Sequence, residues 1–126
     1  MSFKEAEPLL MQSVGKAGED AALRYLEQKG YRCVGRNWRC AYGEIDLIMT
    51  EQEQLVFVEV KTRRSSSSEA AAAGLTRVKL ERLINTIYHY LDAHQHPAEG
   101  WRLDLLTVSI FKGEFVISHW ENCLDW

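Results

Sequence analysis

Two short strings in the middle of the chain carry carboxylates where a buried strand normally carries apolar side chains. They are GEIDLI (Gly43–Ile48) and VFVEVK (Val56–Lys61). Because side chains alternate between the two faces of a strand, Ile45 and Leu47 are expected on one face and Asp46 on the other. In the second string the three valines share one face, and the charged residues share the opposite face.

The polar link Glu51–Gln54 is short enough to join these strings as a β-hairpin. If it forms the loop, Thr50 pairs with Leu55, and Asp46 lies opposite Glu59. A slip of one residue would move Asp46 onto the face of the valines, so the hydrophobic pattern resists it. Carboxylates opposed in this way are about 5 Å apart at Cβ and repel each other. A nearby lysine and a divalent cation would offset that repulsion.

The bulk composition fits one compact α/β domain. The chain has 126 residues, of which 46% are hydrophobic and 26% charged, which is ordinary for a soluble globular protein. We expect residues 1–12 to form a loose leader and residues 13–126 to form the domain. No run approaches the roughly 20 apolar residues of a membrane span. The start does not resemble a signal peptide, and the three cysteines suggest reduced thiols, so a cytoplasmic location is expected.

The net charge of −3 argues mildly against nucleic acid as a partner. The charges are unevenly distributed, however. Residues 1–82 hold thirteen of the fifteen bases and twelve acids, a balance of +1. If bound metal neutralised several of these acids, the surface of this part would become positive.

The hydrophobic pattern predicts a mixed sheet with a helix on each face, an α/β layered domain of order α-β-β-β-α-β-β. The predicted elements are a helix over Val14–Lys29, strands over Tyr31–Arg39, the two strings above, a helix from the N-cap Thr76 to Ala93, and strands over Trp101–Ile110 and Phe115–Trp120. Between the hairpin and the second helix, Ser65–Gly74 is low in complexity. A substrate-facing flap and a plain disordered connection are equally compatible with it.

One acid of the first helix points the wrong way for a solvated residue. Glu19 lies three, four and seven residues before the apolar Ala22, Leu23 and Leu26, so it shares their face. An inward glutamate is costly unless it is paired or binds metal. The alternative is that it only favours the dipole of the first helical turn.

Together these acids could hold a metal ion. Asp46 and Glu59 suit Mg²⁺ or Mn²⁺, which prefer oxygen ligands, and the carbonyl of Val60 could add another. Lys61 could orient or deprotonate a water molecule, and Glu19 could reach the metal directly or through water. The alternative is a surface hairpin with ordinary ion pairs, such as Glu44 with Lys61, which contribute little.

The spaced aspartate and the Glu-x-Lys motif resemble the PD-(D/E)XK nuclease superfamily. Ordered matches over about 90 residues are similar to one bacterial group, the YraN family of small predicted endonucleases. They are GE (Gly18–Glu19), KGY (Lys29–Tyr31), RNWR (Arg36–Arg39), GEIDLI, FVEVKTR (Phe57–Arg63), Lys79 and RLDLL (Arg102–Leu106). Ile45 stands where the superfamily's name has proline, and Ser65–Gly74 departs from the family's usual segment with glycine and proline.

The resemblance implies a restriction-endonuclease-like fold, related to Holliday-junction resolvases, with Asp46, Glu59 and Lys61 as the catalytic trio. It implies that Glu19 is the accessory acid from the first helix. Phosphate contacts would come from Lys79, Arg36, Arg39 and Arg63. By analogy with resolvases, a homodimer is a further expectation.

The expected function is therefore a Mg²⁺- or Mn²⁺-dependent endonuclease acting on DNA, including branched or damaged structures. Two alternatives remain. The protein could be a nucleic-acid-binding module of nuclease fold that cuts little or nothing, or an interaction protein whose acids form only a structural ion site.

Overall fold

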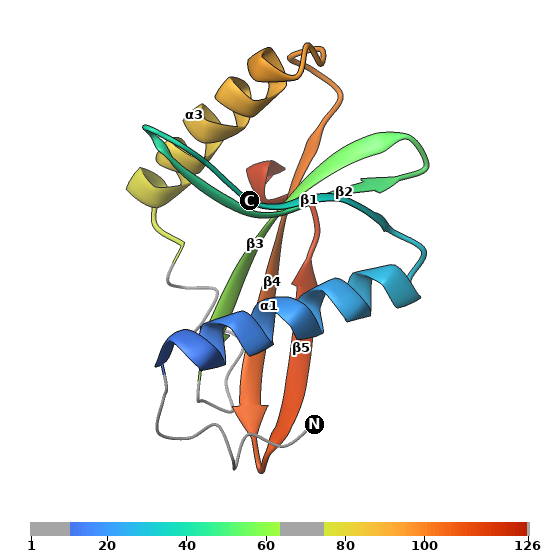
Figure 1. Ribbon diagram of the computed structural model, residues 1–126, viewed down its shortest axis with the longest axis vertical. Helices are drawn as coiled ribbons and strands as arrows, with labels where there is room; N and C mark the ends of the chain where they lie inside the picture. The colour runs from blue at the N-terminus through green and yellow to red at the C-terminus, as the bar shows by residue number, and fades with distance from the viewer. Residues whose placement is uncertain (1–10, 64–74, 126) are drawn as a thin grey trace.

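The computed structural model describes residues 11–63 and 75–125, and its elements follow the predicted order (Figure 1). They are α1 (Met11–Gln28), β1 (Arg32–Cys40), β2 (Gly43–Glu51), β3 (Gln54–Arg63), α3 (Arg77–Ala93), β4 (Arg102–Phe111), β5 (Glu114–Trp120) and the short 3-10 helix η2 (Cys123–Asp125). The first helix begins three residues before the predicted start at Val14. Residues 1–10 of the expected leader and the whole of Ser65–Gly74 lie outside the described residues.

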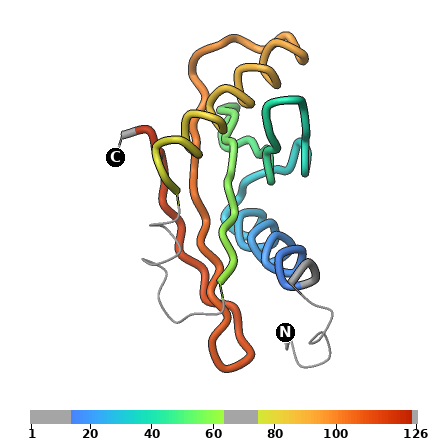
Figure 2. Tube along the Cα trace, turned by 90° about the vertical axis from the view of Figure 1, so that its left-hand side faces the viewer, coloured from blue at the N-terminus to red at the C-terminus, as the bar shows by residue number. Residues whose placement is uncertain are grey.

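The five strands form one mixed sheet in the order β1-β2-β3-β4-β5. The pair β3–β4 is parallel and the other neighbouring pairs are antiparallel. The parallel pair follows from the chain order, because α3 lies between β3 and β4 and carries the chain back to the starting end of the sheet. In Figure 2, α1 and the β1–β2 hairpin lie to the same side of the long strands β3, β4 and β5. The predicted α/β class and mixed sheet are confirmed.

Alternate side chains of β3 feed two separate hydrophobic clusters. Val56, Val58 and Val60 pack in one cluster with Ala22 and Leu26 of α1. Phe57 packs in the other cluster with Leu83 and Ile87 of α3. Since successive residues of a strand point to opposite faces, the two helices cover opposite faces of the sheet.

The local signals at turns and caps act as the sequence indicates. Gly30 ends the first helix with a φ of 97°, a conformation that glycine adopts without penalty. The Thr76 hydroxyl accepts a hydrogen bond from the Lys79 N–H and caps α3. In the hairpin, Thr50 pairs with Leu55 as predicted. The loop is shorter than predicted, because Glu51 and Gln54 also pair.

Ile45 and Leu47, which are predicted to share a face, pack in different hydrophobic clusters. Leu47 packs in the cluster beneath α1, whereas Ile45 packs with Ile48 and Phe57 beneath α3. The regular β2–β3 pairing ends at Leu47 and Val58. The pairing of β2 with β1 continues in an unbroken register past this point, to Cys40 and Gly43. The two side chains therefore reach different clusters where β2 diverges from β3, although β2 itself remains a paired strand.

Helix α1 approaches β3 closely at a glycine. A Cβ atom on Gly18 would overlap the Thr62 hydroxyl oxygen and lie 2.9 Å from Thr62 Cγ2. Threonine is branched at Cβ and has little freedom to move away. The absence of a side chain at Gly18 thus sets how near α1 can bring the next residue, Glu19, to the sheet.

Gly18→Ala is expected to destabilise the fold by about 1–3 kcal/mol, because the added methyl group must displace α1 from Thr62. Gly15→Ala in the same helix is the matched control, since a Cβ there meets no atom within 4 Å. The control should be neutral or stabilising by up to about 1 kcal/mol, from the better helix propensity of alanine. Urea denaturation of both variants measures the difference, and equal free energies of unfolding would contradict this packing.

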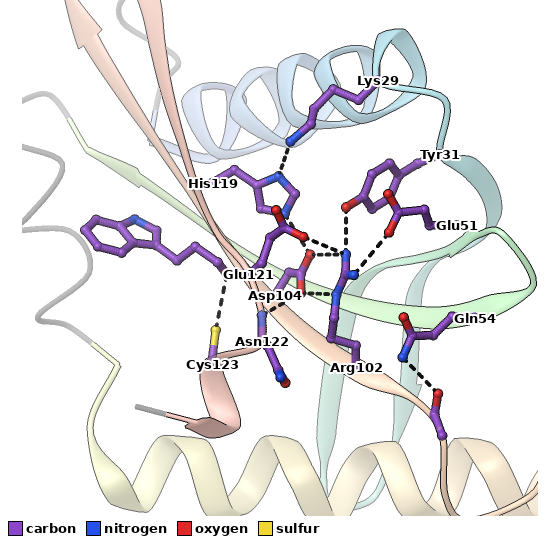
Figure 3. A network of polar contacts seen from close by, with 12 residues as sticks. Lys29, Tyr31, Glu51, Gln54, Arg102, Asp104, His119, Glu121, Asn122 and Cys123 are labelled. Atoms are coloured by element: carbon purple, nitrogen blue, oxygen red, sulfur yellow. Dashed lines mark hydrogen bonds and ion pairs between the residues drawn. The ribbon is translucent and has the colours of Figure 1, made fainter.

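The buried carboxylate of Asp104 lies at the centre of a polar network that connects several elements of the fold (Figure 3). Asp104 of β4 is fully buried and accepts hydrogen bonds from Arg102, from His119 and from the Asn122 N–H. Burial alone would raise the pKa of Asp104, but these hydrogen bonds outweigh it and hold that pKa below its ordinary value.

The partners of Asp104 are themselves anchored. Arg102 also donates to Tyr31 Oη at 2.6 Å and to Glu51 at 3.1 Å. Lys29 Nζ lies 2.8 Å from His119 Nδ1, and because lysine only donates, the ring proton sits on Nε2 and points at Asp104. The network therefore links the turn after α1, β2, β4 and β5 through one carboxylate.

Asp104→Asn is expected to lower the free energy of unfolding by about 3 kcal/mol, because Arg102 loses its closest buried counter-charge. Glu81→Gln is the control, since Glu81 forms an exposed pair with Arg77 on α3 and should cost less than about 0.5 kcal/mol. Chemical denaturation compares them. A loss for Asp104→Asn no larger than that of the control would show that the network contributes little.

Candidate metal and nucleic-acid site

The site forms where the β2–β3 ladder stops. Asp46 is the first residue of β2 beyond the paired segment, and its Oδ2 accepts a hydrogen bond of 2.8 Å from the Val60 N–H. The side chain of Asp46 thus takes a backbone donor of β3. This bond fixes the Asp46 carboxyl against β3, one residue from Glu59.

The predicted approach of Asp46 to Glu59 has an electrostatic consequence. The two side chains lie within hydrogen-bonding reach of each other. Burial, the charge of Glu59 and the charge of Glu19 raise the pKa of Asp46 to about 8, although the Val60 N–H lowers it. Without a cation, therefore, these acids share too much negative charge to be fully ionised together.

Lys61 supplies one positive charge at this point. Its Nζ lies 3.3 Å from Glu59 Oε2, and both side chains are about one-fifth exposed, at 21% and 18%. The predicted alternative pair of Glu44 with Lys61 does not form. Glu44 instead pairs with Arg39 at 2.6 Å.

Glu19 reaches the site from α1 and is held by β1. Its Oε1 accepts a hydrogen bond of 3.0 Å from Asn37 and lies 3.9 Å from Arg36 Nη2. Its charge also contributes to the raised pKa of Asp46. The Glu19 carboxylate, which is expected to point inward, therefore lies beside a neutral donor from Asn37 and a cationic donor from Arg36.

The oxygen donors present fit a divalent ion. A pair of adjacent carboxyls, one with a raised pKa, favours a cation that replaces the proton. Within residues 11–63 and 75–125, no group of three acidic, histidine or cysteine side chains is placed to hold a metal ion. Mg²⁺ does not need one, since it usually keeps several waters and uses one or two carboxylates. Asp46 and Glu59 would be those ligands, with the Val60 carbonyl and Glu19 as the further predicted ones.

The four predicted phosphate contacts lie in different environments. Lys79 lines an open pocket of about 280 Å³ together with Glu59. Arg63 is exposed at the end of β3, two residues beyond Lys61. Arg39 is 76% exposed despite its pair with Glu44. Arg36 is engaged by Asp20 at 2.7 Å and by Glu19, so it is better placed to hold the acids of α1 than to meet a ligand.

Sequence reasoning missed three residues around these acids. Asn37, which holds Glu19, has a φ of 50°, and nothing in its sequence context signals that role. Arg82 and Tyr42 line the same pocket as Lys79. The spacing of Lys79 and Arg82, one turn apart on a predicted helix, could have suggested a shared position for these two cations.

Comparison with known proteins agrees with the resemblance noted in the sequence. The model of the family described as "Uncharacterised protein family UPF0102" matches residues 18–108. The chain belongs to the UPF0102 family. This is the YraN family to which the motifs pointed, and the matched segment contains all the predicted site residues.

Curated UPF0102 relatives match most of the chain. A UPF0102 protein of Chloroflexus aurantiacus is 44% identical over 110 residues, which cover 86% of this chain and 89% of the relative. One from Herpetosiphon aurantiacus is 38% identical over 87% of this chain and 92% of its own length. These names state family membership and no activity.

One solved structure, that of Pyrococcus furiosus SfsA in complex with Ca²⁺, covers 90% of this UPF0102 chain and 64% of the other. Its TM-score is 0.36 and its sequence identity 15%, values that support no conclusion about function. Within the described parts of the chain, no helix combines the length and apolar character needed to cross a bilayer.

The raised pKa of Asp46 predicts how stability varies with pH. In metal-free solution the folded protein keeps a proton that the unfolded chain releases above about pH 4. The folded state then binds more protons, so the free energy of unfolding should fall as pH rises, by up to about 1.4 kcal/mol per unit, until about pH 8. Asp46→Asn removes this component and keeps an acceptor for Val60.

Urea denaturation in the presence of a chelator measures this component. The variant should gain stability relative to the parent protein, and the gain should grow between about pH 5 and about pH 8. Glu81→Gln, on the exposed face of α3, should give a difference that hardly changes with pH. A constant offset for Asp46→Asn would contradict the assigned shift.

Proposed function

We propose that this UPF0102 protein is a divalent-metal-dependent endonuclease that hydrolyses phosphodiester bonds in DNA, including branched or damaged structures. The observation that supports this most directly is the contact between the Asp46 and Glu59 carboxyls, with Lys61 beside them. Paired acids with a shifted pKa next to a lysine are typical of hydrolytic sites.

Each residue of the site would have a separate task. Mg²⁺ or Mn²⁺ bound by Asp46 and Glu59 would polarise the phosphodiester and favour ionisation of a water molecule. The Val60 N–H orients Asp46. Lys61, steadied by Glu59, would position the attacking water and offset negative charge that develops on the phosphate.

Glu19 would complete the acid set from α1. Asn37 holds it at 3.0 Å, which limits its side-chain freedom and thus the entropy lost when it engages a ligand. Among the described residues, the Glu19 carboxylate has this neutral donor and an arginine 3.9 Å away, so it remains available as an acceptor for a metal-associated water.

Exposed cations around the acids would hold the DNA backbone. Lys79, Arg39 and Arg63 keep charges accessible to solvent, and contacts of this kind position a nucleic acid without reading its sequence. Arg36 would contribute indirectly, through Glu19 and Asp20.

A second candidate is a nucleic-acid-binding module of the same fold with little or no catalytic activity. One observation favours it. Glu19 is bonded to Asn37 of β1, and within the described residues no three acidic, histidine or cysteine side chains are placed together to hold a metal ion. The same experiment separates the two candidates.

Purified protein should cut labelled DNA in the presence of Mg²⁺ or Mn²⁺, and a chelator should abolish the cutting. The substrates are linear duplex, single-stranded, flapped and four-way-junction DNA. Glu59→Gln removes a predicted metal ligand and Lys61→Ala removes the adjacent cation, so each should lower the rate of cleavage by about 100-fold or more.

Glu114→Gln, at the exposed start of β5, is the control for surface charge and should cut like the parent protein. Cleavage that survives both Glu59→Gln and Lys61→Ala would refute the assignment of the site. Binding of these DNAs without cleavage under all metal conditions would support the second candidate instead.

A further inference from the structure

An aromatic side chain that is supported by a second ring lines the pocket that contains Glu59. Tyr42, at the tip of the β1–β2 hairpin, stacks on His89 of α3 with ring centroids 4.2 Å apart and an interplanar angle of 13°. His89 covers one face of the tyrosine ring, yet Tyr42 remains 54% exposed. The pair thus presents an exposed aromatic surface whose other side is already supported.

The hairpin tip is seated against α3 by close packing. A Cβ atom on Gly43 would lie 2.8 Å from the Thr86 hydroxyl oxygen, so the missing side chain allows this approach. Thr86 is buried and donates to the Arg82 carbonyl at 2.9 Å. Figure 1 shows the tip of the β1–β2 hairpin reaching α3. The orientation of Tyr42 is therefore fixed by contacts on both sides of it.

The same pocket contains exposed cations beside the acid of the proposed site. Its lining includes Tyr42, Lys79, Arg82 and Glu59. Its other acid, Glu44, is neutralised by Arg39. An aromatic surface next to two lysine or arginine side chains matches a nucleotide, which has a flat base and an anionic phosphate.

We infer that this pocket binds an unpaired nucleotide of the DNA strand, with its base stacked on Tyr42 and its phosphate held by Lys79 and Arg82. The inference rests on the proposed function, because it takes DNA as the ligand of the neighbouring acids. Within a duplex, a base is stacked on both faces and cannot offer one to a protein ring without leaving the helix. The site therefore favours single strands, flaps and junctions over continuous duplex.

Tyr42→Leu should weaken binding to single-stranded and flapped DNA by about fivefold or more, the loss expected for one base–aromatic stack. Binding to blunt duplex of the same sequence should change less than about twofold, because duplex contacts go mainly to phosphates. Fluorescence anisotropy in a chelator measures these affinities without any cleavage. Tyr42→Phe keeps the ring and should bind like the parent protein.

Two further variants separate a loss of base stacking from a general loss of DNA binding. His89→Ala removes the support beneath the ring and should reduce single-strand binding in the same direction as Tyr42→Leu. Tyr88→Leu is the matched control, since Tyr88 is exposed on the same helix, at 45%, but packs against Trp101 outside this pocket. It should leave all affinities unchanged. Unchanged circular dichroism and melting temperature verify that each variant is folded.

A second readout follows the base itself. A single strand that contains 2-aminopurine should lose fluorescence on binding, through stacking on Tyr42, and Tyr42→Leu should abolish that loss. Arg82→Ala should weaken binding and lower its dependence on salt, because one phosphate contact is removed. A free deoxynucleoside monophosphate and an unlabelled single strand are each used to displace the labelled strand. If the monophosphate displaces it at the same concentration as the unlabelled strand does, the pocket is a mononucleotide site and the assignment to a strand is overturned.

The outcomes distinguish this inference from the proposed nuclease activity. If the protein cuts DNA and Tyr42→Leu binds and cuts every substrate like the parent protein, the inference fails and the nuclease stands. An equal loss for duplex and single strand would also overturn it, since the residue would then contact the backbone. If no metal supports cleavage but Tyr42→Leu selectively loses single-strand binding, the pocket assignment holds and the catalytic proposal fails.

Discussion

The hydrogen bond from the Val60 N–H to the Asp46 carboxyl is the constraint on which the candidate site depends. A backbone N–H that faces the end of a ladder needs an acceptor, and here a side chain supplies it at 2.8 Å. The same bond prevents Asp46 from turning toward solvent, so it stays beside Glu59. Lys61 relieves only part of the resulting repulsion, because its ammonium contacts Glu59. The geometry of the fold thus creates an excess of negative charge that a cation would remove.

Much of this arrangement could be predicted from the sequence, because it follows from alternation and short-range turn chemistry. The pairing of Thr50 with Leu55 follows from the valine face and the short polar link. The two helices follow from their apolar stripes, Gly30 and Thr76. The cluster in which Ile45 packs could not be predicted in this way. The β2–β3 pairing ends at Leu47, and beyond it β2 stays paired with β1 alone and carries Ile45 to the cluster beneath α3.

The partners of the arginines were also beyond sequence pattern. Arg36 is sixteen positions from Asp20, and the 2.7 Å contact between them exists because α1 packs across β1. The close approach of Gly18 to Thr62 brings α1 near β3, and from sequence alone a glycine in a helix normally indicates only a position of low helix propensity. Long-range contacts of this kind depend on how the elements are seated, which local periodicity does not encode. They decide, however, which acids of α1 are neutralised and which, like Glu19, remain available as acceptors.

The two aspartates of the sheet's interior, Asp46 and Asp104, differ in how far the fold satisfies their charge. Asp104 accepts hydrogen bonds from three residues, and its pKa is held low. Donors of the protein itself therefore satisfy its negative charge. Asp46 has one backbone donor and two acids near it, and its pKa is raised. Burial opposes ionisation in both, and the difference lies in the neighbours. A carboxyl whose charge the fold satisfies has nothing left for a ligand. One that the fold leaves short of positive charge gains most from a bound cation, and this contrast locates the candidate site at Asp46 rather than at Asp104.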